Sequence, residues 1–322
     1  MAFDLRKDAE DEEPEATRSV DVSRDAGWGD DDAVAARVRL GKISDAIEHL
    51  RTLTAETGAR ELVTKAFEEF DPQSQAIPLE FTDMSEPEDP GVNRTLKLET
   101  VDGPVSFFKP SEGEMEAGRD SQPELSASYR EVAAYRLSDL LGLDVVPHTD
   151  LRIYESNIGL DKDGSMVDVP PLVGSLQHEV PLKALPLSAF SPSDVERIAI
   201  LDYVLASSDR HDENYRTTAD GHPMATDNGY CLPEHSGEGI KSPFVVACLD
   251  KPLSQQLIDL VSAPDLSLVR QVLLDRGISE SATKDAVDRL AEIRETGRIS
   301  GRAWRGKFSD WVPGQGWRTI VR

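Results

Sequence analysis

Cysteine and long apolar runs are scarce in this chain of 322 residues, and each scarcity excludes a class of protein. The two cysteines, Cys231 and Cys248, lie 17 residues apart without a CxxC partner, so they predict neither a disulfide framework nor a zinc site. No segment reaches the ~20 consecutive apolar residues that a membrane-spanning helix requires. The first residues turn acidic at once, whereas a signal peptide begins with basic and then apolar residues. We therefore expect a cytoplasmic protein.

Positive charge is scarce as well. Lysine and arginine together number 35 against 60 acidic residues, which gives a net charge of −25. A field of that sign repels nucleic acid and anionic membrane surfaces. We therefore expect no nucleic-acid partner and no stable association with a membrane. The hydrophobic fraction of 39% is nevertheless enough to build a folded core.

Changes of pattern along the chain predict an α+β protein with two lobes. Residues 1–30 are typical of a disordered acidic tail, and residues 31–75 carry apolar residues at helical spacing, which predicts a helical extension. Residues 76–177 are strand-rich, whereas residues 178–322 are mostly helical, including the part that follows Leu253. A strand-rich part followed by a helix-rich part predicts an N-lobe and a C-lobe with a cleft between them.

Local signals predict the individual elements. An Asp102-Gly103 turn signal between two alternating runs predicts a hairpin. Ser191 followed by Pro192 matches the start of a helix, with a capping residue and a proline in the first turn. The predicted strands are 95–101, 105–109 and 145–154, the predicted helices are 126–141, 192–206 and 281–294, and residues 167–177 are expected to form an apolar connector.

The polar residues that follow the predicted helix 192–206 point to phosphoryl transfer. Asp209 and Asn214 lie five residues apart, and Asp227 follows 13 residues after Asn214, directly before Asn228 and Gly229. Transfer from ATP needs an aspartate that accepts the proton of the attacking hydroxyl, together with an amide and a second carboxylate that hold Mg²⁺. In chain order, Asp209, Asn214 and Asp227 fit these three roles. ATP and Mg²⁺ are therefore the predicted cofactors.

The string Asp-Arg-His-x-x-Asn followed by Asp-Asn-Gly resembles the catalytic and metal-binding loops of the phosphatidylinositol 3- and 4-kinase superfamily. It is also similar to the HipA-type kinases and to a group of actinobacterial kinase-like proteins. The resemblance implies a two-lobed protein-kinase-like fold. Asp-Asn-Gly stands where the larger kinase families carry Asp-Phe-Gly, so the switching behaviour of that phenylalanine is not carried over.

The resemblance also assigns residues in the predicted N-lobe. Lys109, at the end of a predicted strand, stands where the family places its ATP-phosphate lysine, and Glu131 follows 22 residues later as its ion-pair partner. The only candidate for a phosphate-covering loop is Pro90–Arg94, which has one glycine and no GxGxxG. The remaining predicted nucleotide-binding residues are Gly91 and Asn93 in that loop and, by analogy with the connector that meets the adenine, Ser175, Leu176 and Gln177.

Several alternatives remain open. Asp209 taken alone could cap a turn while Arg210 satisfies a local acid, and Lys109 could be an ordinary edge-strand lysine. His211 could orient the catalytic loop or be a buried, hydrogen-bonded histidine. The tryptophans Trp304, Trp311 and Trp317 alternate with basic residues, which is compatible with a nucleic-acid or membrane surface. Because the chain as a whole is acidic, we expect the C-terminal segment to dock on the C-lobe instead.

The predicted set of five residues favours an active kinase over a nucleotide-binding pseudokinase or scaffold, because degenerate kinases usually lose one of the five. Nucleotidyl transfer on the same fold is a further alternative. The segment after Asp227 carries few cations to bind the phosphates of a lipid head group. We therefore expect the acceptor to be a hydroxyl group of a protein, a peptide or a small molecule.

Overall fold

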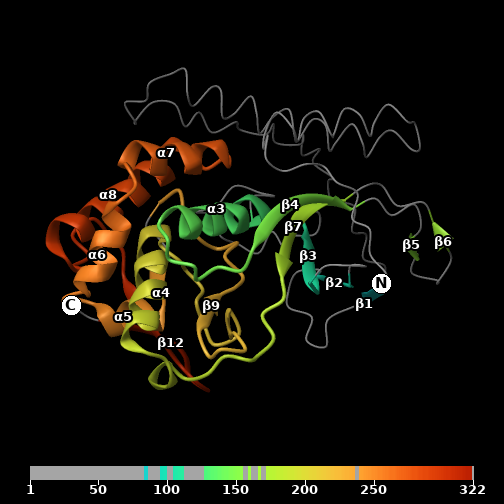
Figure 1. Cartoon of the computed structure of the whole chain (residues 1–322), viewed down its shortest axis with the longest axis horizontal. Helices are drawn as coiled ribbons and strands as arrows, with labels where there is room; N and C mark the ends of the chain where they lie inside the picture. The colour runs from blue at the N-terminus through green and yellow to red at the C-terminus, as the bar shows by residue number, and fades with distance from the viewer. Residues whose placement is uncertain are drawn as a thin grey trace, which may run out of the picture.

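The computed structural model describes residues 83–85, 95–99, 104–111, 127–154, 159–160, 166–167, 172–235 and 239–320. The predicted acidic tail, the predicted helical extension and the candidate loop with Gly91 and Asn93 lie outside these residues. Within them, the chain forms a sheet at one end of the molecule and a group of helices at the other (Figure 1). This is the mixed α+β architecture that the sequence predicts.

The larger sheet is antiparallel and has the strand order β1-β2-β3-β7-β4. The predicted hairpin is confirmed, because Leu96 on β2 pairs with Phe108 on β3. Leu96, Leu98 and Phe108 are buried together on one face of the sheet, and Leu176 packs against them. The strands are β1 (Asp83–Ser85), β2 (Leu96–Glu99), β3 (Ser106–Pro110), β4 (Thr149–Tyr154) and β7 (Leu172–His178).

Strand β7 corrects the prediction of a connector at residues 167–177. It lies in the middle of the sheet, where it pairs with β3 on one side and with β4 on the other. In the sequence, Gly174 indicated a loop, but in the structure this glycine allows two strands to approach closely. A Cβ atom at Gly174 would lie 2.2 Å from the carbonyl oxygen of Lys109, so only glycine lets the two strands approach this closely.

Helix α3 (Ala127–Leu140) confirms the first predicted helix and contacts both β4 and β7 (Figure 1). Helix α4 (Pro192–Leu205) confirms the second. As predicted, Ser191 caps it, since its hydroxyl accepts a hydrogen bond from the Asp194 amide at 3.2 Å. Helix α4 ends at Ala206, which has a left-handed backbone with φ 50°, and the chain then enters the polar stretch around Asp209.

The C-terminal part is helical as far as Thr296, which confirms the third predicted helix as α8. It then departs from the prediction, because residues 308–320 form a β-hairpin whose turn contains Gly314 and Gly316 with positive φ. The elements are η2 (Leu187–Ala189), α5 (Pro243–Cys248), α6 (Gln255–Ser262), α7 (Leu266–Asp275), α8 (Glu280–Thr296) and the strands β5 (Gly159–Leu160), β6 (Met166–Val167), β8 (Tyr215–Thr217), β9 (Pro223–Ala225), β10 (Ile240–Lys241), β11 (Phe308–Val312) and β12 (Gly316–Ile320).

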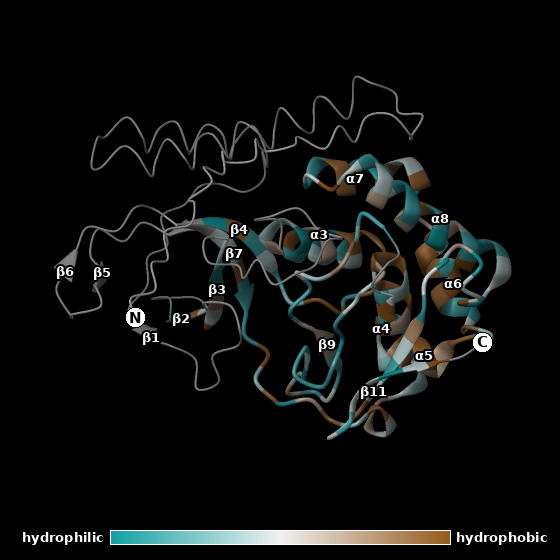
Figure 2. Cartoon of the chain, turned by 180° about the vertical axis from the view of Figure 1, so that it is seen from behind, coloured by the Kyte–Doolittle hydropathy of each residue, from teal (hydrophilic) through white to brown (hydrophobic). Residues whose placement is uncertain are grey.

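The main hydrophobic core lies among the helices. It joins apolar side chains of α3, α4, α5 and α8 and extends to Trp304 and Phe308. Figure 2 shows the apolar stretches of α4 and α6 within this half of the molecule. Among the described residues, no helix combines the length and the apolar character needed to cross a membrane. Because the core includes α4, the loop that follows this helix starts from a fixed position.

Candidate active site

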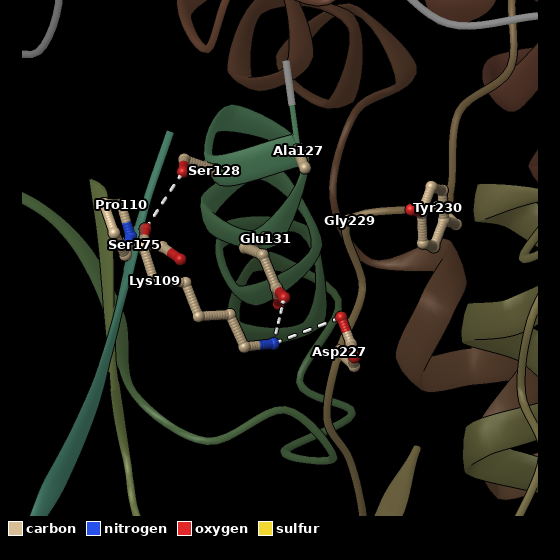
Figure 3. A pocket seen from close by; sticks show the side chains of 9 residues that line it. All are labelled: Lys109, Pro110, Ala127, Ser128, Glu131, Ser175, Asp227, Gly229 and Tyr230. Atoms are coloured by element: carbon tan, nitrogen blue, oxygen red, sulfur yellow. Dashed lines mark hydrogen bonds and ion pairs between the residues drawn. The ribbon is translucent and has the colours of Figure 1, made fainter. Parts of the chain in front are cut away.

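Lys109, Glu131 and Asp227 meet at the inner face of the sheet, although they come from three different elements. Figure 3 shows Lys109 of β3 pointing toward Glu131 of α3 and toward Asp227, which follows β9. The Lys109 Nζ atom lies 2.7 Å from Glu131 Oε1 and 3.1 Å from Asp227 Oδ1. We call these three residues the Lys109 cluster. The structure thus brings together three of the five residues predicted from the sequence, and their catalytic roles remain predictions.

The charges of the Lys109 cluster stabilise one another. Burial alone would lower the pKa of Lys109, but the charges of Asp227 and Glu131 outweigh it and raise the pKa above its ordinary value. Burial alone would raise the pKa of Asp227, but the ammonium of Lys109, with smaller contributions from Arg210 and His211, lowers it. At neutral pH the site therefore holds a charged lysine beside a charged aspartate.

A pocket opens beside this cluster. Its walls are formed by the end of β3, the start of α3, Ser175 of β7 and the segment from Asp227 to Tyr230 (Figure 3). The Ser128 hydroxyl at the start of α3 donates a hydrogen bond to the Lys109 carbonyl oxygen at 3.4 Å. The ammonium of Lys109 and the carboxylate of Asp227 therefore lie at the wall of a pocket, which is the position that a phosphate-binding lysine requires.

The loop from Asp209 to Asn214 is closed on itself. The Asn214 side-chain nitrogen donates a hydrogen bond to the Asp209 carbonyl oxygen at 2.7 Å, so the five-residue spacing forms a compact turn. The Thr226 amide donates to the Asn214 carbonyl oxygen at 3.0 Å, which places Asn214 beside the residues that precede Asp227. Because the side-chain nitrogen of Asn214 bonds to the Asp209 carbonyl oxygen, the side-chain oxygen of Asn214 points away from that Asp209 carbonyl.

Arg210 organises this region, and the sequence analysis did not identify that role. Its guanidinium group is buried and donates to the Asp202 carboxylate of α4, with Nη2 3.0 Å from Oδ1. It also donates to the carbonyl oxygens of Asn214 and Thr226 and to the side-chain oxygen of Asn228. The available signal was Asp202, an acidic residue among the apolar residues of a predicted helix, because a buried charge requires a partner.

Glu131 and Asn228 connect the sheet to the loops. The second carboxylate oxygen of Glu131, Oε2, accepts a hydrogen bond from the Asn228 amide at 2.9 Å. The side chain of Asn228 receives the bond from Arg210, so this residue contacts both the α3 glutamate and the buried arginine. Asn228 thus fixes the backbone after Asp227 through hydrogen bonds, at the position where the protein-kinase motif Asp-Phe-Gly carries a phenylalanine.

The segment after Asp227 is held tightly in place. Asp227 has a left-handed backbone with φ 53°, a conformation that aspartate tolerates better than most residues. A Cβ atom at Gly229 would lie 2.9 Å from the Cβ of Ala127, so the segment passes directly against the start of α3. Farther along, the buried Arg130 of α3 donates to the carbonyl oxygens of Cys231 and Leu232.

The structure places the predicted adenine-contacting residues differently from the expectation. Ser175 lines the pocket, whereas the side chain of Leu176 packs on the opposite face of the sheet. The Gln177 side chain donates to the Thr149 hydroxyl at 2.9 Å. All three residues pair with β3 and β4, so their backbone groups are used within the sheet. This pairing does not favour contact of these backbone groups with an adenine, and their nucleotide-binding role stays a prediction.

The fold and this cluster define a kinase-like protein. A sequence profile of the family described as phosphatidylinositol 3- and 4-kinase matches residues 177–262, which include Asp209, Asn214 and Asp227. The rice (Oryza sativa subsp. japonica) protein "Phosphatidylinositol 4-kinase gamma 4" is 37% identical over 119 residues, covering 33% of this chain and 20% of the relative. These matches support a phosphatidylinositol 3-/4-kinase-like superfamily, as the sequence motifs indicate, and the profile supports it over residues 177–262.

Two groups of solved structures are similar at lower identity. The Golgi casein kinase with Mn/ADP bound is 13% identical with a TM-score of 0.44, covering 77% of this chain and 78% of that one. Hydra Fam20 with sugar is 14% identical with a TM-score of 0.38, covering 76% of this chain and 92% of that one. The chain matches only about a fifth of the length of the rice relative.

Proposed function

We propose that this protein transfers the γ-phosphoryl group of ATP, with Mg²⁺ as the metal ion, to a hydroxyl group of a protein, a peptide or a small molecule. The observation that carries the proposal is the meeting of Lys109, Glu131 and Asp227 at the wall of one pocket, with Nζ–O distances of 2.7 and 3.1 Å. These residues come from a strand, a helix and a loop far apart in the sequence. In the proposed division, residues 76–177 form the N-lobe and residues 178–322 the C-lobe of a cytoplasmic kinase.

The chemistry of the donor groups fits a magnesium nucleotide. Mg²⁺ prefers hard oxygen ligands and is commonly held by one or two protein groups together with phosphate oxygens and water. Asp227 supplies a carboxylate and Asn214 an amide oxygen. Lys109 supplies a positive charge for the same phosphates.

The chain's own groups would divide the work of the reaction. Bound ATP would supply the phosphoryl group, and the divalent ion would neutralise its charge. Glu131 holds the Lys109 ammonium at the pocket wall, and Asn214 keeps the Asp209 loop closed. Asp209 would orient the acceptor hydroxyl and take up its proton as the hydroxyl oxygen bonds to the γ-phosphorus and the bond to ADP breaks.

Two features of the described structure favour a protein, peptide or small-molecule acceptor over a phosphoinositide. The residues after Asp227 that the structure describes, up to Pro243, offer Lys241 and His235 as cationic side chains. The neighbouring Arg130 is buried on carbonyl oxygens and is ion-paired with Glu234, so it does not add a free cation there. Head-group phosphates are usually bound by clustered arginine or lysine side chains.

The test uses purified protein, Mg²⁺, a cell extract, and ATP labelled at either the γ or the α phosphate. Asp209→Ala and Asp227→Ala serve as inactive variants, and exposed Arg318→Ala serves as a matched control. We expect transfer of the γ label that both inactive variants abolish and the control retains. Removal of one charge-stabilising group costs about 100- to 1,000-fold in comparable sites.

The other outcomes distinguish the alternatives. Transfer of the α label would replace phosphoryl transfer by nucleotidyl transfer on the same fold. Binding of ATP without transfer of either label would favour a pseudokinase or scaffold. Labelling of phosphatidylinositol vesicles that is lost in Asp209→Ala would overturn the proposed acceptor class while leaving the kinase proposal intact.

A further inference from the structure

We propose that Trp311, on the C-terminal hairpin β11–β12, is a positioning residue for the loop that carries Asp209. The proposal rests on the proposed phosphotransfer and extends it to a segment outside the residues that the family profile matches, which end at 262. This segment contains the tryptophans Trp304, Trp311 and Trp317, and none of them has a role in the proposed reaction. The structure shows where this part of the chain lies.

The C-terminal hairpin is attached directly to the Asp209 loop through β10. Strand β10 pairs in parallel with β11, with Lys241 opposite Ser309. The backbone of Lys241 also bonds to the loop on the other side, because its amide donates to Ser207 at 2.9 Å and its carbonyl accepts from Arg210 at 2.9 Å. The C-terminal segment therefore docks on the helical half, as predicted, and forms a three-stranded sheet behind the loop.

Trp311 completes this attachment with a side-chain contact. Its ring centroid lies 5.3 Å from that of His211, at an angle of 39° between the rings. Trp317 also contacts Trp311 edge to face, with centroids 5.1 Å apart. Aromatic pairs at such distances stabilise their mutual orientation. The indole of Trp311 thus contacts both Trp317 of β12 and His211, the residue two positions after Asp209.

The two nitrogens of the His211 ring face the Glu213 amide and the Asp209 carboxylate, so the orientation of the ring affects both groups. Nδ1 accepts a hydrogen bond from the Glu213 amide at 3.2 Å, which leaves the proton of the neutral ring on Nε2. Nε2 lies 3.9 Å from Asp209 Oδ2. A rotation of the His211 ring would change its contacts with the Glu213 amide and with the Asp209 carboxylate. The indole of Trp311, packed on this ring, therefore helps to hold Asp209, which the proposed reaction uses as its base.

The indole N–H of Trp311 is buried and forms no hydrogen bond within the described structure. The ring is therefore held by packing, and a phenylalanine in its place loses no polar contact. Trp311→Phe is accordingly the conservative variant, and Trp311→Ala is the disruptive one. Arg318→Ala, an exposed position on β12 of the same hairpin, is the control for nonspecific effects of mutating the hairpin.

The experiment measures ADP release from MgATP by the three variants and the wild-type full chain, together with their melting temperatures. We expect Trp311→Ala to lower kcat by about 10- to 100-fold, the range for a misplaced catalytic group, with KM for ATP changed less than about twofold. Trp311→Phe should restore most of the rate, and Arg318→Ala should match the wild type. A kcat within twofold of the wild type in Trp311→Ala, or a loss in Trp311→Phe as large as in Trp311→Ala, would overturn the proposal.

A second readout separates this inference from the proposed function. In NMR spectra the His211 ring protons should show a ring-current shift that Trp311→Ala removes and Trp311→Phe largely keeps. If the wild-type chain turns over no ATP but this shift is lost in Trp311→Ala, the proposed function fails while the positioning of the loop by Trp311 stands. If the His211 signals are the same in all variants, the positioning proposal is wrong whatever the activity.

Discussion

Two charged clusters lie on either side of the segment that begins at Asp227, and they differ in their access to solvent. In the Lys109 cluster, the side chains of Lys109 and Asp227 are 22% and 43% exposed. In the second, which we call the Arg210 cluster (Arg210, Asp202, Asn228 and Ser242), Arg210 and Asp202 are 1% and 0% exposed. An accessible charge can exchange its protein partner for a ligand, whereas a sealed one cannot. The first cluster is therefore suited to chemistry and the second to holding the loops in place.

The hydrogen bonds of the Arg210 cluster support this distinction. Asp202 accepts from Arg210 and also from the Ser242 hydroxyl at 2.7 Å, so its carboxylate is fully engaged by protein groups. A buried ion pair is compensated only when such additional bonds satisfy it. Asn228 joins the two clusters, because its amide donates to Glu131 and its side chain accepts from Arg210. The Lys109 cluster is thus connected to the Arg210 cluster through Asn228.

The largest effect on stability is expected from Arg210→Met, which leaves the Asp202 carboxylate buried without its counter-charge. Breaking a buried pair in this way typically costs about 3–5 kcal/mol. Urea denaturation of the full chain measures the loss, and Arg318→Met on the exposed hairpin surface should change the free energy of unfolding by less than about 0.5 kcal/mol. A cost below about 1 kcal/mol for Arg210→Met would show that the Arg210 cluster contributes no more to stability than an exposed ion pair, contrary to our inference.

An intermediate effect is expected from Gly229→Ala, which tests how closely the segment between the clusters packs on α3. The new methyl group would lie 2.9 Å from the Cβ of Ala127. Overpacking of this kind typically costs about 1–3 kcal/mol. The double variant Ala127→Gly/Gly229→Ala removes the opposing methyl group, so it should recover part of the stability and of the MgATP turnover. No recovery in the double variant would place the cause of the loss elsewhere.

The features that were predictable from the sequence are those set by neighbouring residues. The Ser191 cap and the hairpin around Asp102 are local signals, and both elements form as expected. Strand β7 was missed because Gly174 looks like a loop residue in sequence, whereas its cause is the Lys109 carbonyl of another strand. The pairing of β11 with β10 joins segments more than 60 residues apart, so no local signal predicts it. The hairpin β11–β12 is itself local, and the glycines of its turn, Gly314 and Gly316, were a signal that the prediction did not use.

The candidate site was predictable in part for the same reason. Asp209 and Asn214 were found because their spacing is local, and the structure closes them into one turn. Lys109 and Glu131 were found through a family resemblance, since nothing in their own surroundings in the sequence links them to Asp227. The partners of Arg210 are Asp202 of α4, the carbonyl oxygens of Asn214 and Thr226, and the side chain of Asn228. Only the folded chain brings these groups together.

The smallest effect on stability is expected from Asp227→Asn, although this variant should lose phosphoryl transfer entirely. Lys109 keeps Glu131 at 2.7 Å, and Asp227 is partly exposed, so the free energy of unfolding at pH 7 should change by less than about 1 kcal/mol. Urea denaturation and the labelled-ATP assay measure the two quantities separately. A loss of stability as large as that of Arg210→Met would show that the Lys109 cluster is itself a structural ion pair.

The pH dependence of the same variant sharpens the test. Burial would raise the pKa of Asp227, but the Lys109 ammonium outweighs it and lowers the pKa, so the ion pair stabilises the folded chain above the ordinary aspartate pKa of about 3.9. This contribution is lost as the pH falls through the lowered pKa of the folded state. The difference in unfolding free energy between wild type and Asp227→Asn should therefore shrink toward acid pH. A difference that stays constant from pH 7 to below pH ~3 would mean that the charge of Asp227 contributes nothing to stability, and that Lys109 draws its stabilisation from Glu131 alone.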